Sequence, residues 1–176
     1  MAPINSIRRP KIIILGHGRH GKDSVAEMLQ EKAGYKFTSS SRFVGEECIW
    51  DNWGCAVYDT FDEMYEDREN HRDLWGQLIA AYNVPDKTRT AKTMFDRGFD
   101  LYVGMRRIEE LIACRLSDVY DLTVWVDRSE HLPPEPSTSM TIRKSDAMHV
   151  IDNNGTLEDL AQNVQDFIRQ LGLADV

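Results

Sequence analysis

The stretch KIIILGHGRHGKDS, residues 11–24, joins an apolar run to a glycine-rich loop. Residues 11–15 form an apolar, β-branched run of the kind found in strands that are buried on both faces. Gly16, Gly18 and Gly21 follow, and an amphipathic helix is predicted to start directly after them. Backbone N–H groups in such a turn point inward, and the helix adds the positive end of its dipole. The stretch therefore predicts a cradle for phosphate groups.

The end of this loop departs from the usual phosphate-loop pattern, GxxxxGK followed by Ser or Thr, because Asp23 stands where the hydroxyl is expected. Three interpretations are open: the carboxylate binds magnesium, it stabilises the helix N-terminus, or the loop no longer binds nucleotide. The first two are compatible, and we favour a metal-linked role, with Ser24 as an alternative ligand if the helix entry shifts. Lys22 is expected to reach the β- and γ-phosphates of ATP. For the whole stretch, the alternative is an ordinary glycine-rich turn with a surface lysine.

The composition favours one domain of a reduced, intracellular protein. The chain has 176 residues, 41% of them hydrophobic, which suits a single core. Its formal charge of -8 argues against a protein that grips a nucleic-acid polymer and leaves small anionic ligands open. Cys48, Cys55 and Cys114 lack CxxC spacing, which argues against a zinc site. Residues 1–10 lack the apolar stretch of a signal peptide and no later run reaches membrane-spanning length, so we expect a cytoplasmic protein without a membrane partner.

Apolar runs and breaker residues alternate along the chain in a strand and helix order. The predicted strands cover residues 11–15, 35–39, 101–104, 122–127 and 147–152. The predicted helices cover residues 21–33, part of 68–82, 88–97, 107–116 and a C-terminal stretch that begins at Thr156. Five strands joined by helical crossovers imply an α/β fold, with a parallel sheet between two layers of helices. Ligands bind such sheets at the carboxyl ends of the strands, where the glycine-rich loop lies.

Helical periodicity also predicts which side chains face the core. In residues 107–116, the inward side is expected to hold Ile108, Leu111, Ile112 and Leu116. In the C-terminal helix, the inward side is expected to hold Leu157, Leu160, Val164, Ile168 and Leu171. Thr156 is expected to cap this last helix, with Asp159 returning the hydrogen bond.

Two segments lie outside this alternation. Residues 42–98, between the second and third strands, have no clear strand and are rich in charged and aromatic residues, which predicts a helical insertion. Residues 129–139, SEHLPPEPSTS, hold three prolines and are predicted to form a mobile loop within a short lid over about 128–145. The chain has no internal repeat and no linker, so the prediction is a single domain over residues 1–176.

Several stretches together resemble a known family: the loop above, GYKFTSSSRF, YVGMRRIEEL, VWVDR and HVIDNNGTLEDL. They resemble the bacteriophage-type deoxynucleoside monophosphate kinases of the P-loop nucleoside monophosphate kinase superfamily. Two other kinase families share single features: phosphomevalonate kinases of animals carry a GKD loop, and dephospho-CoA kinases share the terminal strand, Asp-Asn-x-Gly and helix. The resemblance covers the N-terminal third, residues 102–128 and the C-terminal fifth, and the middle of the chain is less distinctive.

The resemblance implies a three-layer P-loop kinase fold with the strand order 2-3-1-4-5. It also implies transfer of the γ-phosphate of ATP to a deoxynucleoside monophosphate, with ATP and Mg²⁺ as cofactors, in the host cytoplasm if the chain is of phage origin. Because GKD occurs in that family, Asp23 becomes an expected magnesium residue. A homodimer formed through the insertion helices is implied by the resemblance alone.

The residues predicted to contact ATP lie in the glycine-rich loop and after the last strand. They are Gly16, Gly18, Arg19, His20, Gly21, Lys22, Asp23, Ser24, Asn153 and Gly155. In similar kinases the loop at 153–155 passes the adenine and contacts it through backbone groups, although an ordinary turn is an equally good interpretation. Neither His17 nor His20 is assigned chemistry of its own.

The residues predicted to bind the acceptor are Arg42, Arg68, Arg72, Trp75, Arg106 and Glu110. Arg42 and Arg106 follow the second and third strands, where they are placed to hold the acceptor phosphate, and surface salt bridges are the alternative. The family's Val-Arg-x-x-x-Glu segment falls on residues 105–110 and carries Arg106 and Glu110 over. Gly104 stands where the family often has an acidic residue.

The other acceptor candidates each have a structural alternative. Arg68 and Arg72 form a second clamp on the acceptor or a solvated helix face. Trp75 stacks on the acceptor base or, like most aromatic residues of the insertion, belongs to its core. Arg128 is expected to stabilise the transferring phosphoryl group, with Arg143 or Lys144 beside it, unless the lid is simply a connection.

The sequence thus predicts an ATP- and magnesium-dependent kinase of nucleoside monophosphates, with Lys22, Arg106 and Arg128 as catalytic residues. The first alternative is a P-loop kinase of another small metabolite. The second is a nucleotide-binding regulatory protein that transfers no phosphate.

Overall fold

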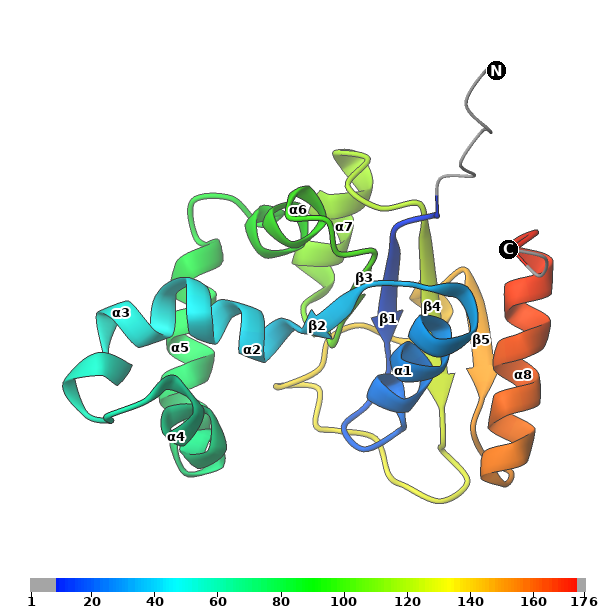
Figure 1. Ribbon diagram of the computed structural model, residues 1–176, viewed down its shortest axis with the longest axis horizontal. Helices are drawn as coiled ribbons and strands as arrows, with labels where there is room; N and C mark the ends of the chain where they lie inside the picture. The colour runs from blue at the N-terminus through cyan, green and yellow to red at the C-terminus, as the bar shows by residue number, and fades with distance from the viewer. Residues whose placement is uncertain (1–8, 174–176) are drawn as a thin grey trace.

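A five-stranded parallel sheet forms the centre of the computed structural model, which describes residues 9–173. Its strands are β1 Ile12–Leu15, β2 Phe37–Ser39, β3 Leu101–Val103, β4 Leu122–Asp127 and β5 His149–Asp152. They lie side by side in the order β2-β3-β1-β4-β5, and every neighbouring pair is parallel (Figure 1). The predicted α/β class and strand order are confirmed. Residues 1–8, on which part of the signal-peptide expectation rested, lie outside the described residues.

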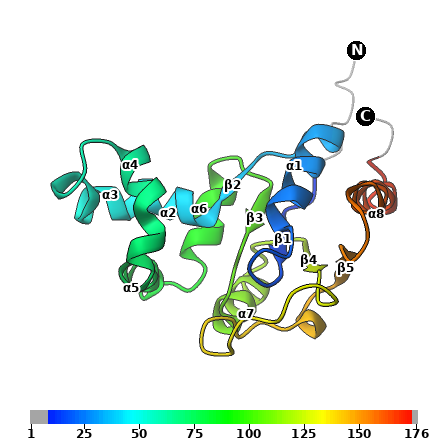
Figure 2. The ribbon, with the colours of Figure 1, turned by 90° about the horizontal axis from the view of Figure 1, so that it is seen from below.

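Helices cover both faces of this sheet and enclose two apolar cores. One face is covered by α1 Lys22–Ala33 and α8 Leu157–Gln170, the other by α6 Arg89–Asp96 and α7 Ile108–Leu116 (Figure 2). Successive side chains of β1 point to opposite faces, so Ile12 and Ile14 join the first core while Ile13 and Leu15 join the second. All four side chains of β1 are fully buried, as the continuous apolar run predicts.

Between β2 and β3 the chain forms a helical insertion without a strand, as predicted. It ends with α6, which packs on the sheet. Before α6 come α2 Ser40–Val44, a π-helical turn Gly45–Ile49, α3 Trp50–Asn52, a 3₁₀ turn Gly54–Ala56, α4 Phe61–Glu66, a 3₁₀ turn Asp67–His71 and α5 Arg72–Asn83. These elements extend away from the β2 edge of the sheet (Figure 1). They carry a small core of their own around Ile49, Met64 and Trp75.

Three side chains that were predicted to be buried are exposed. Ile112 and Leu116 of α7 are 48% and 78% exposed, and Leu157 is 65% exposed. Helix α7 is buried through Leu111 and Cys114, and Ile112 lies about 100° further round the helix than Leu111, outside this narrow stripe. Leu157 is the first residue of α8, and the packing of that helix begins one turn later.

Within residues 9–173, no helix is long and apolar enough to cross a membrane.

The predicted cap of α8 is confirmed and can be tested by mutation. Thr156 Oγ1 accepts a hydrogen bond from the N–H of Asp159 at 3.2 Å, and Asp159 Oδ2 accepts one from the N–H of Thr156 at 2.9 Å. We expect Thr156→Ala to lower the free energy of unfolding by about 1 kcal/mol in urea denaturation, because a helix N–H loses its partner. The exposed Thr138→Ala is the control, and equal stability of both variants would contradict the capping role.

Candidate functional site

The glycine-rich loop leaves the carboxyl end of β1 and enters α1 at the middle of the sheet. Gly16 has a φ of +143°, and a Cβ atom placed on it would lie 2.7 Å from the carbonyl oxygen of Val126 in β4. Gly21, the N-cap residue of α1, has a φ of +94°. Because L side chains rarely adopt such angles, both positions favour glycine. The backbone of the loop is thereby held close to β4.

Lys22 is the first residue of α1, and its side chain folds back over the loop. Its Nζ atom donates a hydrogen bond to the carbonyl oxygen of His17 at 2.7 Å. Burial lowers the pKa of the Lys22 ammonium, the charge of Arg106 lowers it further, and Glu135 opposes both effects. The lysine therefore lies among charged groups in the centre of the loop, as its role in the phosphate-loop pattern requires.

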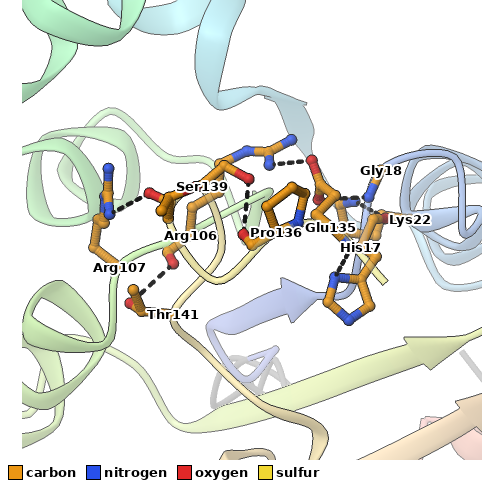
Figure 3. Close-up of polar contacts among 10 residues, drawn as sticks. His17, Gly18, Lys22, Arg106, Arg107, Glu135, Pro136, Ser139 and Thr141 are labelled. Carbon is orange, nitrogen blue, oxygen red and sulfur yellow. Dashed lines mark hydrogen bonds and ion pairs between the residues drawn. The ribbon is translucent and has the colours of Figure 1, made fainter. Parts of the chain in front are cut away.

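A carboxylate from the segment after β4 lies in this loop. Glu135 Oε2 accepts a hydrogen bond from the N–H of Gly18 at 2.7 Å, and its Oε1 pairs with the guanidinium of Arg106 at 2.6 Å (Figure 3). The N–H of Glu135 donates to His17 Nδ1 at 3.1 Å. Burial raises the pKa of Glu135, but the contacts with Arg106, the hydrogen bond from Gly18 and the charge of Lys22 together outweigh burial, so the net pKa is lowered. Glu135 is thus an anion bound to the glycine-rich loop.

This bound carboxylate is a direct indication of what the loop can hold. A backbone N–H and a guanidinium that converge on one carboxylate are also donors suited to a phosphate oxygen. These donors therefore fit phosphate groups: the N–H of Gly18 one in the loop, and Arg106 one beside it. Sequence reasoning missed Glu135 because its neighbours are turn-forming residues. The one signal was an acidic side chain among the prolines of PPEPSTS.

The magnesium expectation rests on Asp23, which is exposed in the first turn of α1. Among residues 9–173, no group of three His, Cys, Asp or Glu side chains is arranged to hold a metal ion. Magnesium at nucleotide sites is commonly held by one or two carboxylates together with substrate phosphates. A single carboxylate beside the loop therefore fits a magnesium ion that arrives with ATP, and it equally fits a residue that stabilises the helix N-terminus.

His20 and Asn153 fasten the loop to its neighbours. The His20 side chain is fully buried, and its Nδ1 accepts a hydrogen bond from the backbone N–H of Arg128 at 3.1 Å. Burial lowers the pKa of His20, and the nearby His17 and Lys22 lower it further. Asn153, also buried, donates from Nδ2 to the carbonyl oxygen of His20 at 2.9 Å. His20 is predicted only as a contact of ATP, and the structure shows its buried side chain as a brace between the loop and the chain after β4.

Three further residues that were predicted to contact ATP lie after β5 or in the glycine-rich loop. The side chain of Asn153 turns toward the glycine-rich loop, so only its backbone remains for the predicted contact with adenine. Gly155 lies next to the N-terminus of α8, where an added Cβ atom would meet Asp159. Arg19, in the middle of the glycine-rich loop, is exposed and has a φ of +64°.

Two of the acceptor candidates follow the neighbouring strands β2 and β3. Arg106 lies in the loop between β3 and α7 and reaches the phosphate loop through Glu135. Arg42, in α2, pairs with Glu46 at 3.2 Å and with Asp62 at 2.9 Å. The ion pairs of Arg42 are the surface salt bridges that the alternative interpretation expects.

The remaining acceptor candidates lie in other surroundings. The guanidinium of Arg68 lies 4.1 Å from the centre of the Tyr65 ring. Arg72 is exposed and pairs with Glu69 at 3.4 Å, as a solvated helix face would. Trp75 is only 4% exposed and lies in the core of the insertion, the position that was expected of most of these aromatic residues.

Glu110 lies at the junction of the insertion with α7. It accepts a hydrogen bond from Asn83 Nδ2 at 3.3 Å, and burial raises its pKa. Asn83 is itself buried, and its Oδ1 accepts from the hydroxyl of Thr90 at 2.8 Å. In this structure Glu110 thus helps to join α5, α6 and α7.

A cavity of about 490 Å³ opens beside the glycine-rich loop. Its lining residues include His17, Trp125, Asp127, Glu135, Ile142 and Lys144. Lys144 Nζ pairs with Asp127 Oδ2 at 2.6 Å. Burial raises the pKa of Asp127, but the contact with Lys144 and the hydrogen bonds from Ser129 together outweigh burial, so the net pKa is lowered. The volume lies within the usual range for small-molecule sites, about 300–1,000 Å³.

The predicted lid lies against the site in this structure. The N–H of Thr141 donates to the carbonyl oxygen of Arg106 at 2.9 Å, and Thr141 Oγ1 accepts from the N–H of Ile108 at 2.8 Å. Met140 and Ile142, on either side, are buried in the second core. The segment around Thr141 is therefore anchored to the loop that carries Arg106.

The chain was compared with protein families, with curated proteins and with solved structures. No protein-family model matches the chain, and no curated protein matches it significantly. An unliganded sugar kinase from Janibacter sp. HTCC2649 superposes with a TM-score of 0.52 at 12% identity, over 95% of this chain and 96% of that one. Shikimate kinase from Bacteroides thetaiotaomicron gives a TM-score of 0.50 at 10% identity, over 92% of this chain and 98% of that one. At such identities the likeness concerns the fold alone: the chain has the three-layer fold of P-loop kinases.

Proposed function

We propose that the protein is a kinase that transfers the γ-phosphate of ATP to a (deoxy)nucleoside monophosphate. The observation that carries this proposal is the anion site at the carboxyl end of β1, where Gly18, Lys22 and Arg106 surround a carboxylate. In ATP-bound protein, phosphate oxygens take the place of that carboxylate.

Each residue at the site then has a defined task. The N–H groups of the loop and the ammonium of Lys22 hold the β- and γ-phosphates, while Arg106 binds the acceptor phosphate. Arg128, at the start of the lid, neutralises charge on the phosphoryl group that is transferred. Magnesium bound with ATP, and held by Asp23, supplies neutralisation of the phosphate charge. Transfer is in line, without a covalent enzyme intermediate.

Further parts of the proposal concern the surroundings of the site. The backbone of residues 153–155 passes the adenine, and Arg42 and Arg68 at the insertion contact the acceptor. The segment over about 128–145 excludes water, because hydrolysis of ATP would otherwise compete with transfer. The whole chain acts as a single kinase domain in the cytoplasm, with the insertion of about 42–98 as its acceptor-binding part and as the contact of a homodimer.

An assay of acceptor-dependent ADP release tests the activity. The panel contains the common nucleoside and deoxynucleoside monophosphates, together with hydroxylated acceptors of the kinds named for the two similar structures, a sugar and shikimate. We expect turnover with at least one monophosphate and none without an acceptor. Turnover only with a hydroxylated metabolite would show that the acceptor is such a metabolite and not a nucleoside monophosphate. ATP binding without any turnover would favour a nucleotide-binding regulatory protein.

Asp23 gives a separate prediction about magnesium. We expect Asp23→Ala to lower magnesium-dependent turnover by about tenfold or more, because an oxygen ligand of the ion is lost, whereas Asp23→Ser keeps an oxygen and much of the activity. Initial rates are measured as a function of magnesium concentration. Glu27→Ala, which removes an exposed carboxylate one turn further along α1, is the control. Equal rates in all four proteins would leave Asp23 with a helix-stabilising role only.

A further inference from the structure

Glu135 is held in the phosphate loop by groups from three parts of the chain. Gly18 in the loop binds one carboxylate oxygen, Arg106 after β3 binds the other, and His17 accepts from the backbone of Glu135. We infer that Glu135 is an internal competitor of the nucleotide: it occupies a phosphate position of the loop until ATP displaces it, and its displacement frees Arg106 for the acceptor. This inference rests on the proposed function.

Competition follows from the geometry at Gly18. Its N–H already donates to Glu135 at 2.7 Å, and the carboxylate oxygens lie 3.3 Å and 3.6 Å from the point where a Cβ atom of Gly18 would stand. A phosphate oxygen that bonded to the same N–H would overlap the carboxylate. The two anions would also repel each other at this distance. Nucleotide phosphate and Glu135 therefore exclude each other from the loop.

Displacement of Glu135 changes the state of Arg106. The guanidinium now pairs with Glu135 Oε1 at 2.6 Å. A guanidinium that is paired with one carboxylate is less available to a second anion. Once phosphates fill the loop, Arg106 loses this partner and can bind the acceptor phosphate. Binding of ATP therefore frees Arg106 at the same time, which favours an order in which ATP binds before the acceptor.

The segment around Glu135 can move between two fixed points. On one side, the N–H of Glu130 donates to Asn154 Oδ1 at 3.0 Å. On the other side, Thr141 is bound to the loop that carries Arg106. Glu135 lies between these anchors and between two prolines, so it can leave the loop without disturbing either core.

The strength of this contact determines how far it weakens nucleotide binding. The side chains of Arg106 and Glu135 are 46% and 24% exposed, so their ion pair is partly screened by water. The hydrogen bond from Gly18 is charge-assisted and adds to it. Because ATP binds only the molecules in which Glu135 has left the loop, the apparent dissociation constant for ATP rises as the inverse of that open fraction. With about one molecule in ten open, we expect a penalty of about tenfold.

Glu135→Ala tests this competition in the full-length protein. Isothermal titration calorimetry with ATP, ADP and adenosine measures the three dissociation constants. We expect Glu135→Ala to bind ATP and ADP about tenfold more tightly and adenosine unchanged, because adenosine has no phosphate to place on the loop. Glu135→Gln, which keeps an acceptor oxygen but no charge, should lie between wild type and Glu135→Ala. Glu130→Ala removes the same charge from an exposed side chain of the same segment and should bind as wild type does.

The link to Arg106 is measured by a double-mutant cycle. In an Arg106→Ala background the ion pair is already broken, so Glu135→Ala should gain clearly less affinity for ATP than it gains in wild type. An equal gain in ATP affinity in wild type and in Arg106→Ala would show that displacement of Glu135 is not coupled to the release of Arg106.

The outcomes separate this inference from the proposed function. Equal or weaker binding of ATP by Glu135→Ala would overturn the competition, whatever the catalytic activity. Tighter binding by Glu135→Ala, with no acceptor-dependent turnover in any protein, would uphold the competition and overturn the kinase activity. A wild type and a Glu135→Ala variant that both fail to bind ATP would overturn the two together.

Discussion

Lys22→Ala is expected to lower acceptor-dependent turnover by at least about a hundredfold while the protein remains folded. The ammonium lies in the loop, bonded to the carbonyl oxygen of His17 at 2.7 Å and close to Glu135 and Arg106. Removing one group that stabilises charge in a transition state typically costs about a hundred- to a thousandfold in rate. Steady-state kinetics with saturating acceptor measure the effect on kcat and on the KM for ATP.

The control for this variant lies on the same helix. Lys32 is exposed in the last turn of α1, so Lys32→Ala changes the charge by the same amount at a distance from the loop. It should keep wild-type rates. Thermal unfolding should give nearly equal midpoints for both variants, because the carbonyl oxygen that Lys22 leaves belongs to His17, which lines the open cavity, where water can replace the ammonium. Full activity of Lys22→Ala would show that the loop does not hold the reacting phosphate.

Gly16→Ala is expected to have the largest effect on the fold and the loop together. A methyl group there meets the carbonyl oxygen of Val126 at 2.7 Å, and the φ of +143° strains any L side chain. Because the obstacle is the backbone of a central strand, neither partner can move cheaply. Strain and overpacking together predict a loss of about 2–4 kcal/mol in the free energy of unfolding. ATP binding should weaken at the same time, since the loop must shift away from β4.

A second glycine provides the matched control. Gly76 is an exposed residue inside α5, and nothing lies within 4 Å of a Cβ atom placed on it. Gly76→Ala should raise the free energy of unfolding by about 0.5–1 kcal/mol, because alanine is the better helix former. Urea denaturation and ATP titration of both variants compare the two positions. Loss of stability at Gly76 equal to that at Gly16 would contradict the steric argument.

The fold could be predicted because its strands are short, apolar and separated by clear breakers. Residues 122–127 form a strand with the predicted bounds, and the start of α8 is marked by the capping pair of Thr156 and Asp159. These signals are local in the sequence, so they can be read without knowledge of the tertiary structure. The strand order came from the resemblance to a kinase family and agrees with the observed sheet.

Features that depend on distant parts of the chain could not be predicted. The contact of Glu135 with Gly18 joins residues 117 positions apart, and nothing local to either residue specifies it. The buried position of His20 depends on the backbone of Arg128 and on Asn153, which belong to other loops. Periodicity alone also assigned too wide an inner face to α7, because the width of the buried stripe depends on the surface it packs against.

If the loop presents the γ-phosphate of ATP to an acceptor, the transferred phosphorus atom can be followed from ATP to its product. The protein is incubated with magnesium, with ATP labelled at the γ-phosphorus and with each deoxynucleoside monophosphate in turn, and the products are separated. We expect label to appear in the diphosphate of at least one acceptor, and we expect Lys22→Ala to form no labelled diphosphate. Label that stays in ATP or appears only as inorganic phosphate with every acceptor would contradict it.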